Sequence, residues 1–318
     1  MVATGSDSWP RSYLYCPGDQ PDRLSRAGGW GADAVIADLE DSVHARRKGV
    51  ARRTVAGWLA EGVTGEVWAR VNPDSLAEDL DAVVAAGLRG VVLPKAEPGV
   101  AATLDELLTR REHERGLPPG RLVVQAVIET ARGLLAAAEL ADAPRVVRLG
   151  VGEADLAAEL GADLRADPEV LGPLRLQLVV ASAAAGIAAP VGPASTDFRD
   201  LAALRASTHG LLRLGFRGRT AIHPAQLACI NEVFTPSAEQ VARASALISA
   251  FDAAADAGTG VITGPDGTMA DAAVLRSARD VLARAAWVPA HAGHPAHADG
   301  PAHAGHTAPD DGPDSGTA

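Results

Sequence analysis

A chain of 318 residues can bury a large core, either as one big domain or as two ordinary ones. Its formal net charge of -11 at pH 7 argues against nucleic acid or an anionic membrane as the main partner, and an aromatic content of 3% leaves few platforms for stacking bases. The chain start lacks the pattern of a secretory signal, and no apolar run is long and uncharged enough to span a bilayer. We therefore expect a cytoplasmic protein with no nucleic-acid or membrane partner.

In chain order, short apolar runs alternate with helical segments rich in alanine and leucine. This alternation implies parallel strands joined by crossovers, and eight such units predict a (β/α)8 TIM barrel. A doubly wound sheet is the structural alternative, but no GxGxxG fingerprint follows the first run. The runs predicted as strands are residues 12–16, 34–39, 66–71, 90–94, 122–129, 145–152, 187–192 and 216–224.

The domain organisation follows from the barrel. We predict a flexible N-terminus at residues 1–10 and a catalytic barrel domain over 11–235. Thr235 or Ser237 can cap a further helix, so a C-terminal helical extension is expected over 236–287. The last segment, 288–318, is rich in Pro, Gly, Ala and His without apolar periodicity, and we predict that it is disordered.

Polar residues capable of chemistry follow nearly every predicted strand. The active site of such a barrel lies where the strands end, because the eight βα loops converge there. The expected site therefore draws on residues from many separate loops. They are Pro17, Gly18 and Asp19; Asp38, Glu40 and Asp41; Arg70 and Asn72; Lys95; Glu129; Glu153 and Asp155; and His223.

Glu129 and Asp155 follow adjacent strands, so their carboxylates can approach one site. A pair of carboxylates with no Cys/His cluster nearby favours a hard cation that binds oxygen, such as Mg²⁺ or Mn²⁺. The alternative is that both acids serve helix N-termini, since each precedes a helical segment.

Arg70 and Lys95 are the candidate cations of the site. Arg70 ends an apolar strand, where a buried charge needs a partner, and an ion pair with Glu40 or Asp41 would supply one. Alternatively, or in addition, its guanidinium holds a substrate carboxylate or a developing enolate oxygen. Lys95 either binds an anionic substrate or is a solvated loop charge.

Two further residues near the predicted site have structural interpretations. His223, before a proline, is expected to be structural rather than a general base. Cys16 lies close to the site, but no base accompanies it, so we expect a packed thiol rather than a nucleophile. Cys16 and the distant Cys229 do not suggest a disulfide framework.

Seven motifs in fixed order resemble the citrate lyase beta subunit-like CoA ester lyases of the HpcH/HpaI aldolase superfamily. Each motif alone is modest, but the ordered set is specific and runs from about Arg11 to Arg284. The motifs are RSYLYCPGD, ADAVIADLEDSVHARRKGVAR, VWARVN, GLRGVVLPKAE, VIETARGLLAAAELA, GVGEADLAAELG and AIHPAQLACINEVFTPS.

The resemblance implies a Mg²⁺-dependent carbon–carbon lyase in a homotrimer or homohexamer. Its substrate would be a 3-hydroxyacyl-CoA such as malyl-CoA or citramalyl-CoA, cleaved to acetyl-CoA and a 2-oxo acid. By similarity, Glu129 and Asp155 are the metal ligands. Arg70 holds the substrate's carboxylate or carbonyl group, and Glu40 with Asp41 fixes that arginine.

The resemblance also suggests where CoA and a further acid would lie. CoA would rest near Pro17, Gly18, Arg23, Arg26 and Lys48. The late DGTMAD patch resembles the segment that carries an acid into a neighbouring subunit's site in malyl-CoA lyase-like relatives. Here that acid is Asp271, although many relatives have a bulky aliphatic residue where this chain has Ala270.

Several alternatives share this barrel and metal pair. They are a malyl-CoA thioesterase, a CoA-independent 2-oxo acid aldolase, and a citrate lyase beta subunit acting on a carrier-bound thioester. A noncatalytic regulatory subunit is a further alternative, but it need not retain Arg70, Glu129, Asp155 and Asp271 together.

Overall fold

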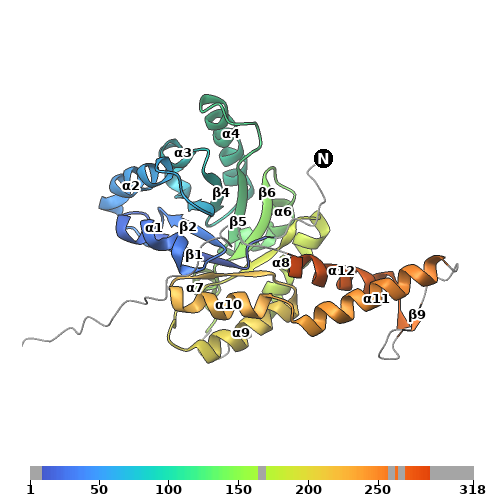
Figure 1. The fold of residues 1–318 in the computed structure, drawn as a ribbon. Helices are drawn as coiled ribbons and strands as arrows, with labels where there is room; N and C mark the ends of the chain where they lie inside the picture. The colour runs from blue at the N-terminus through green and yellow to red at the C-terminus, as the bar shows by residue number, and fades with distance from the viewer. Residues whose placement is uncertain (1–8, 164–169, 257–261, 264–268, 287–318) are drawn as a thin grey trace, which may run out of the picture.

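Eight parallel strands close into a barrel in the order β1 to β8 (Figure 1), which confirms the predicted (β/α)8 fold. The computed structural model describes residues 9–163, 170–256, 262–263 and 269–286. Each observed strand falls within or beside a run predicted from the sequence. The strands are β1 (Ser12–Pro17), β2 (Ala34–Asp38), β3 (Glu66–Arg70), β4 (Leu88–Leu93), β5 (Val123–Ile128), β6 (Val146–Val151), β7 (Ala188–Gly192) and β8 (Gly218–Ala221).

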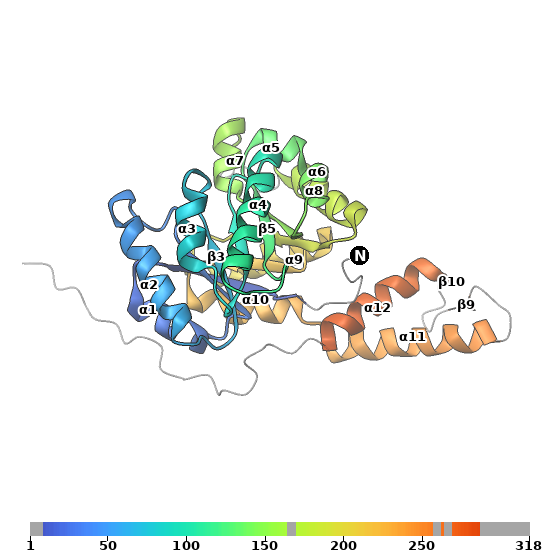
Figure 2. The same cartoon turned by 90° about the horizontal axis from the view of Figure 1, so that it is seen from above.

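Helices cover the outside of the barrel (Figures 1 and 2). The segment after β5, expected from its sequence to be helical throughout, is divided at Ala136, whose φ of -94° and ψ of 11° interrupt the helix. The helices around the barrel are α1 (Pro21–Ala27), α2 (Lys48–Ala60), α3 (Leu76–Val83), α4 (Pro98–Glu114), α5 (Ala131–Leu135), α6 (Ala137–Ala141), α7 (Glu153–Leu160), α8 (Gly172–Ala185), α9 (Leu201–Leu214) and α10 (Leu227–Phe234).

The side chains of the strands alternate between the barrel interior and the helical shell. In β2, Ala34 and Ile36 belong to the interior cluster, whereas Val35 and Ala37 pack in the larger cluster that joins strands to helices. The same alternation places Trp68 of β3 in the interior cluster. Positions two residues further on therefore face inward at the carboxyl end: Asp38 after Ile36, and Arg70 after Trp68.

The opposite end of the barrel is closed by a buried polar contact. Arg148 of β6 is 1% exposed, and its Nη1 donates hydrogen bonds to the Tyr13 hydroxyl at 3.0 Å and to the Pro10 carbonyl at 2.9 Å. Burial raises the pKa of Tyr13 to about 12, against the lowering effect of Arg148. Tyr13 thus remains a neutral hydroxyl in the lower interior layer.

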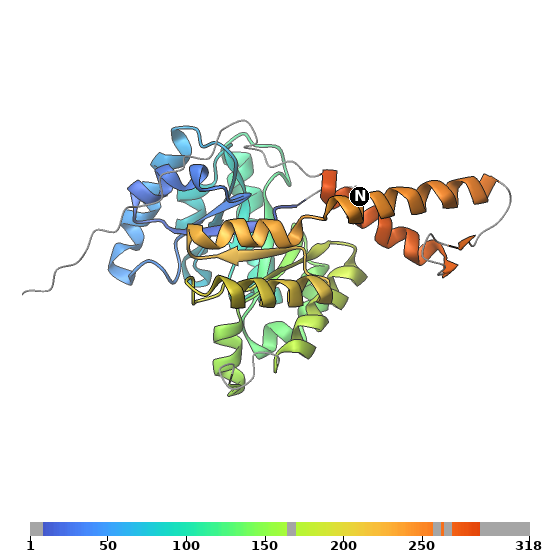
Figure 3. The same ribbon diagram turned by 60° about the horizontal axis from the view of Figure 1, so that its bottom comes forward.

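A C-terminal arm leaves the barrel after α10 and projects away from it in all three ribbon views (Figures 1, 2 and 3). Its helices, α11 (Ala238–Asp256) and α12 (Ala272–Ala286), pack on each other. The short antiparallel strands β9 (Ile262–Thr263) and β10 (Met269–Ala270) lie at its far end.

Polar contacts tie the base of the arm to the barrel domain. Arg217 Nη2 lies 3.3 Å from Asp280 Oδ2 of α12, and Arg284 Nη1 donates a hydrogen bond to the Phe234 carbonyl at 3.2 Å. Of the predicted flexible start, 1–10, residues 1–8 lie outside the described residues, whereas Trp9 packs on the interior cluster and Pro10 is buried. The predicted disordered tail at 288–318 also lies outside the described residues. Among the described helices, none has the length and apolar character needed to cross a bilayer.

Candidate active site

The centre of the candidate site is a carboxylate–guanidinium pair between adjacent strands. Asp38 and Arg70, the last residues of β2 and β3, are register partners. Arg70 donates from Nε to Asp38 Oδ1 at 2.7 Å and from Nη2 to Asp38 Oδ2 at 2.6 Å. A fork-to-fork pair of this kind fixes the plane of the guanidinium as well as its position.

Asp38 corrects the expectation about which acid holds Arg70. Glu40 does contribute, because its Oε2 lies 2.9 Å from Arg70 Nη1. Asp41, predicted to act with Glu40, is 63% exposed and 3.7 Å from the same nitrogen. Asp38 makes the two-point contact because it continues the inward-facing series of Ala34 and Ile36 in β2. That two-residue period was the signal in the sequence that could have identified it.

The fold holds the Asp38–Arg70 pair in its charged form. Burial alone opposes the charge on Asp38, but Arg70 and hydrogen bonds from Ser42 and the Glu40 backbone lower its pKa below the ordinary value. Asp38, in turn, helps to raise the pKa of Arg70, against the opposing effect of burial. Two of the five guanidinium N–H groups donate to Asp38, and Nη1 forms an ion pair with Glu40. Among the described residues, the second N–H of Nη2 has no hydrogen-bond acceptor and can bind a ligand.

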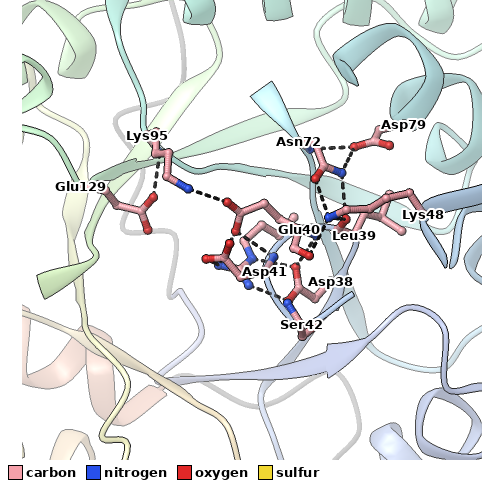
Figure 4. A network of polar contacts seen from close by, with 11 residues as sticks. Asp38, Leu39, Glu40, Asp41, Ser42, Lys48, Asn72, Asp79, Lys95 and Glu129 are labelled. Atoms are coloured by element: carbon pink, nitrogen blue, oxygen red, sulfur yellow. Dashed lines mark hydrogen bonds and ion pairs between the residues drawn. The ribbon is translucent and has the colours of Figure 1, made fainter. Parts of the chain in front are cut away.

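Lys95 connects Glu40, the acid that also pairs with Arg70, to Glu129 (Figure 4). Its Nζ lies 2.8 Å from Glu40 Oε1, and its backbone N–H donates to Glu129 Oε2 at 2.9 Å. Lys95 adopts a left-handed φ of 46°, which is unusual for a residue with a side chain. Lys95 is an exposed residue whose ammonium pairs with Glu40 and whose backbone N–H binds Glu129; its role in substrate binding stays a prediction.

Glu129, which follows β5, is a buried carboxyl group at the carboxyl end of the barrel. Burial raises its pKa to about 7, the Lys95 N–H opposes the shift, and the nearby charges of Glu40 and Asp155 add to it. Thr130, not Glu129, caps α5 by accepting a hydrogen bond from the Gly133 N–H, so the helix-cap interpretation of Glu129 is wrong.

Gly152, which sequence analysis did not single out, makes room for Glu129. A Cβ at position 152 would lie 2.5 Å from Cγ of Glu129, closer than real side chains approach. The residue after β6 must therefore lack a side chain if the Glu129 carboxylate is to lie between the two strand ends.

Asp155 lies in the first turn of α7, after β6, and is exposed. Since β5 and β6 are neighbours in the barrel, the two acids lie on adjacent loops, as predicted. Among the described residues, no three His, Cys, Asp or Glu side chains form a complete cage for a metal. Two carboxylates alone suit Mg²⁺, which keeps several water or substrate oxygens in its coordination shell.

Lys48 has a structural task beside the site. Its ammonium donates to the Leu39 carbonyl at 2.7 Å, to the Glu40 carbonyl at 2.7 Å and to Asn72 Oδ1 at 2.8 Å. Asn72 is itself held by Asp79. Two ammonium donors thus hold the loop that carries Glu40 and the third binds Asn72; the expected contact of Lys48 with CoA stays a prediction.

A pocket of about 750 Å³ opens beside this network. Its wall includes Glu40, Lys48 and Lys95, together with residues from the starts of α2, α4 and α5. A volume of this size fits a small-molecule ligand. Of the predicted CoA contacts, Lys48 lines this pocket, whereas Arg23 and Arg26 are exposed on α1.

The β1–α1 loop follows Pro17, the last residue of β1, and packs tightly against β2. The Gly18 N–H donates to the Asp38 carbonyl at 2.8 Å, and a Cβ at position 18 would lie 2.7 Å from that oxygen. Glycine is thus needed for close backbone approach at this position.

Asp271 stands apart from the site of its own chain. It precedes α12 and follows β10, at the far end of the arm (Figure 2). Its Oδ1 accepts hydrogen bonds from the Ala273 and Val274 N–H groups, and these bonds lower its pKa. Within one chain the arm does not bring this acid to the barrel.

His223 and Cys16 have the structural surroundings that the sequence predicts. His223 Nδ1 accepts a hydrogen bond from the Ala225 N–H, and its ring stacks on Phe198 with a centroid distance of 4.4 Å. Burial raises the pKa of the Cys16 thiol to about 12, which keeps it protonated and unreactive.

Comparison with known proteins identifies the family. The model of the HpcH/HpaI aldolase/citrate lyase family matches residues 11–224, more than half of the chain. The chain belongs to the HpcH/HpaI aldolase/citrate lyase family. The predicted recognition is confirmed, and so is the class of enzyme, a carbon–carbon lyase, at the level of this family.

Two curated relatives of this family member carry different activities in their names. The (3S)-malyl-CoA thioesterase of Cereibacter sphaeroides (strain KD131 / KCTC 12085) is 35% identical over 280 residues, covering 86% of this chain and 94% of the relative. Citrate lyase subunit beta of Escherichia coli (strain K12) is 31% identical over 282 residues, covering 86% and 93%. Membership alone therefore does not fix the reaction.

A solved structure of another protein shares the fold. It is protein CitE from Mycobacterium tuberculosis, in complex with magnesium, acetoacetate and coenzyme A. It is 32% identical in sequence, the match covers 88% of this chain and 99% of that one, and the TM-score is 0.70.

Proposed function

We propose that this protein is a Mg²⁺-dependent lyase that cleaves a 3-hydroxyacyl-CoA, such as malyl-CoA or citramalyl-CoA, to acetyl-CoA and a 2-oxo acid. The observation that carries the proposal is the buried Glu129 carboxyl group, with Asp155 on the adjacent loop, beside an arginine that Asp38 locks in place. The M. tuberculosis protein CitE, crystallised with magnesium, acetoacetate and coenzyme A, supports this choice of cofactor and substrate class.

Glu129 and Asp155 would hold the cation. Both supply carboxylate oxygens, which Mg²⁺ prefers to nitrogen or sulfur, with Mn²⁺ as the alternative. When bound, Mg²⁺ supplies Lewis-acid polarisation of the hydroxyl and adjacent carboxylate of the substrate. The Lys95 N–H orients Glu129 for this task by holding its Oε2.

Arg70 would hold the substrate's carboxylate or carbonyl oxygen. The guanidinium is already fixed by Asp38 and Glu40, so it does not lose rotational freedom when the substrate binds. The N–H groups that do not donate to Asp38 favour oxygens that gain negative charge as the carbon–carbon bond breaks.

Asp271 would complete the site from a neighbouring subunit. As the carbon–carbon bond breaks and the enolate of acetyl-CoA forms, the Asp271 carboxylate of the neighbouring arm would accept the proton of the substrate hydroxyl. The same carboxyl group would then give that proton to the enolate carbon. Support comes from the arm, which carries Asp271 away from its own barrel. CoA itself would lie near the β1–α1 loop, with Pro17, Gly18, Arg23 and Arg26.

The test measures products from malyl-CoA, citramalyl-CoA and citryl-CoA, with Mg²⁺ and then with chelator. We expect acetyl-CoA and a 2-oxo acid in equal amounts, and loss of activity on chelation. Glu129→Gln and Asp155→Asn should each reduce turnover by about a thousandfold or more, because each removes a metal charge partner. Metal-independent cleavage, or wild-type rates in both variants, would contradict the proposal.

Thioester hydrolysis is the second candidate, because a (3S)-malyl-CoA thioesterase is 35% identical to this chain. The same incubation separates the two reactions. A thioesterase releases free CoA and malate from malyl-CoA, whereas a lyase releases acetyl-CoA and glyoxylate. A thiol reagent detects free CoA directly, and its appearance without acetyl-CoA would favour the thioesterase.

A further inference from the structure

Tyr15 occupies an inward-facing position at the carboxyl end of β1 that the proposed reaction does not yet use. Tyr13 belongs to the interior cluster and Tyr15 packs against it, whereas Leu14 and Cys16 lie in the clusters between strands and helices. The β1–β2 register places Tyr15 one interior layer below Asp38. Tyr15 therefore forms part of the floor beneath the candidate site.

The ring of Tyr15 supports the guanidinium of Arg70. The central carbon of that guanidinium lies over the ring, 4.6 Å from its centroid. Asp38 and Glu40 contact the nitrogens at the edges of the guanidinium plane. The Tyr15 ring packs on one face of that plane. A cation packed on an aromatic face in this way gains further stabilisation when water is excluded.

The hydroxyl of Tyr15 has no hydrogen-bond partner among the described residues. Tyr15 as a whole is half-buried, in contrast to Tyr13, which is fully buried and accepts from Arg148. Burial raises the pKa of Tyr15; Arg70 opposes this, and Asp38, Glu129 and Glu40 add to it. A neutral phenol that is only half-buried can donate its hydrogen bond to water or to a ligand oxygen.

We propose that Tyr15 is a specificity-determining substrate contact. Its ring supports Arg70, and its hydroxyl donates a hydrogen bond to an oxygen of the 2-oxo acid half of the substrate. This inference rests on the proposed function, since it places the acid half between Arg70 and the barrel floor. Tyr15 packs on the interior cluster of the barrel, whereas the CoA portion would lie on the β1–α1 loop that follows this strand.

The kinetic test uses the condensation direction, with acetyl-CoA and either glyoxylate or pyruvate in the presence of Mg²⁺. Tyr15→Phe keeps the ring and removes only the hydroxyl. It should raise KM for the 2-oxo acid about fivefold and leave KM for acetyl-CoA unchanged. Tyr15→Leu also removes the ring under Arg70 and should lower kcat/KM for the 2-oxo acid about fivefold further.

Tyr13→Phe is the matched control. It removes the other tyrosine hydroxyl of the same strand, one layer deeper, where the partner is Arg148. It should lower thermal stability and leave both KM values unchanged. If Tyr13→Phe and Tyr15→Phe change the same kinetic constants to the same extent, the effect is structural and the proposed contact is wrong.

A second readout does not depend on turnover. The chain has two tyrosines, so incorporation of 3-fluorotyrosine gives two ¹⁹F resonances, which Tyr13→Phe assigns. Addition of Mg²⁺ with pyruvate should shift the Tyr15 resonance and leave that of Tyr13 in place. An unmoved Tyr15 resonance at saturating pyruvate would overturn the inference.

The two proposals can fail separately. If the wild type condenses or cleaves thioesters but Tyr15→Phe has unchanged kinetics and an unmoved resonance, the Tyr15 contact is wrong and the proposed function stands. If no thioester reacts, the proposed function is wrong. The ¹⁹F titration with pyruvate then still reports whether a 2-oxo acid reaches Tyr15.

Discussion

At the scale of single residues, Glu129 is a carboxyl group whose ionised form is disfavoured by the fold. Its carboxyl group is buried, and its pKa rises from the ordinary 4.5 to about 7. A carboxyl group in this state is destabilising once ionised, because it lost its hydration without gaining a full counter-charge. The proposed cation would supply that counter-charge.

Glu129 therefore predicts how stability changes with pH. In chelator, the stability from the neutral carboxyl is fully present below pH 4.5 and is lost as pH rises through about 7, because the unfolded chain ionises first. Glu129→Gln is neutral at every pH. We expect it to match the wild type near pH 4.5 and to exceed it at pH 8 by up to about 3 kcal/mol.

Chemical denaturation at pH 4.5, 6 and 8 measures this difference. Mg²⁺ added at pH 8 should restore stability to the wild type and leave Glu129→Gln unaffected. Equal stability of the two proteins at pH 8 in chelator would show that the Glu129 pKa is not raised.

The residues of the site differ in how far the sequence predicts them. Strand order predicts that the loops of Glu129 and Asp155 lie together, because their strands are adjacent, whereas their role as metal ligands comes from the family resemblance. Asp38 is expected in the site but not as the partner of Arg70, although its two-residue spacing from Ile36 marks it as inward-facing. The left-handed Lys95 and the space beside Gly152 have no local sequence signal, because both are set by where Glu129 packs.

At the scale of elements, the arm formed by α11 and α12 raises the question of where Asp271 acts. Its helices were predicted from their periodicity, but no local pattern predicts that they project away from the barrel. The direction of the arm depends on tertiary contacts such as the ion pair between Arg217 and Asp280. An acid at the far end of the arm serves catalysis only if another subunit supplies the barrel.

Subunit complementation tests this arrangement. An Arg70→Ala subunit has an inactive barrel and an intact arm. An Asp271→Asn subunit has an intact barrel and an inactive arm. Mixed assemblies of these two inactive variants pair an intact barrel with an intact arm. They should recover about a quarter of wild-type activity under random mixing.

The matched control mixes Arg70→Ala with Glu129→Gln. Both substitutions damage the barrel, so no combination of subunits contains an intact one and no activity should return. If the first mixture also stays inactive while each variant assembles normally, Asp271 does not act across subunits.

At the scale of the whole molecule, we propose a homotrimer or homohexamer in which each arm covers a neighbouring barrel. The barrel buries its own core, and the closed order of its strands could be predicted because each unit repeats the same alternation. Assembly could not be predicted in the same way, since it depends on surfaces whose partner lies in another chain.

Dilution should show whether activity depends on the assembled oligomer. If the site is complete only in the assembly, specific activity falls at the protein concentrations where the oligomer dissociates. Sedimentation velocity measured alongside the lyase assay compares the two transitions. A monomer with full specific activity would contradict the assembly and the trans role of Asp271 together.

The link from Lys95 to Glu40 and Glu129 has a consequence for charge balance. With Glu129 ionised, four carboxylates stand against two cations, Arg70 and Lys95. The carboxylates are those of Asp38, Glu40, Glu129 and Asp155. The surplus of two negative charges equals the charge that one Mg²⁺ would neutralise. Without a dication, the raised pKa of Glu129 means that a proton offsets part of this surplus. Uptake of the cation would then expel that proton. Metal loading would acidify an unbuffered solution, and apparent affinity for Mg²⁺ would increase as pH rises toward 8.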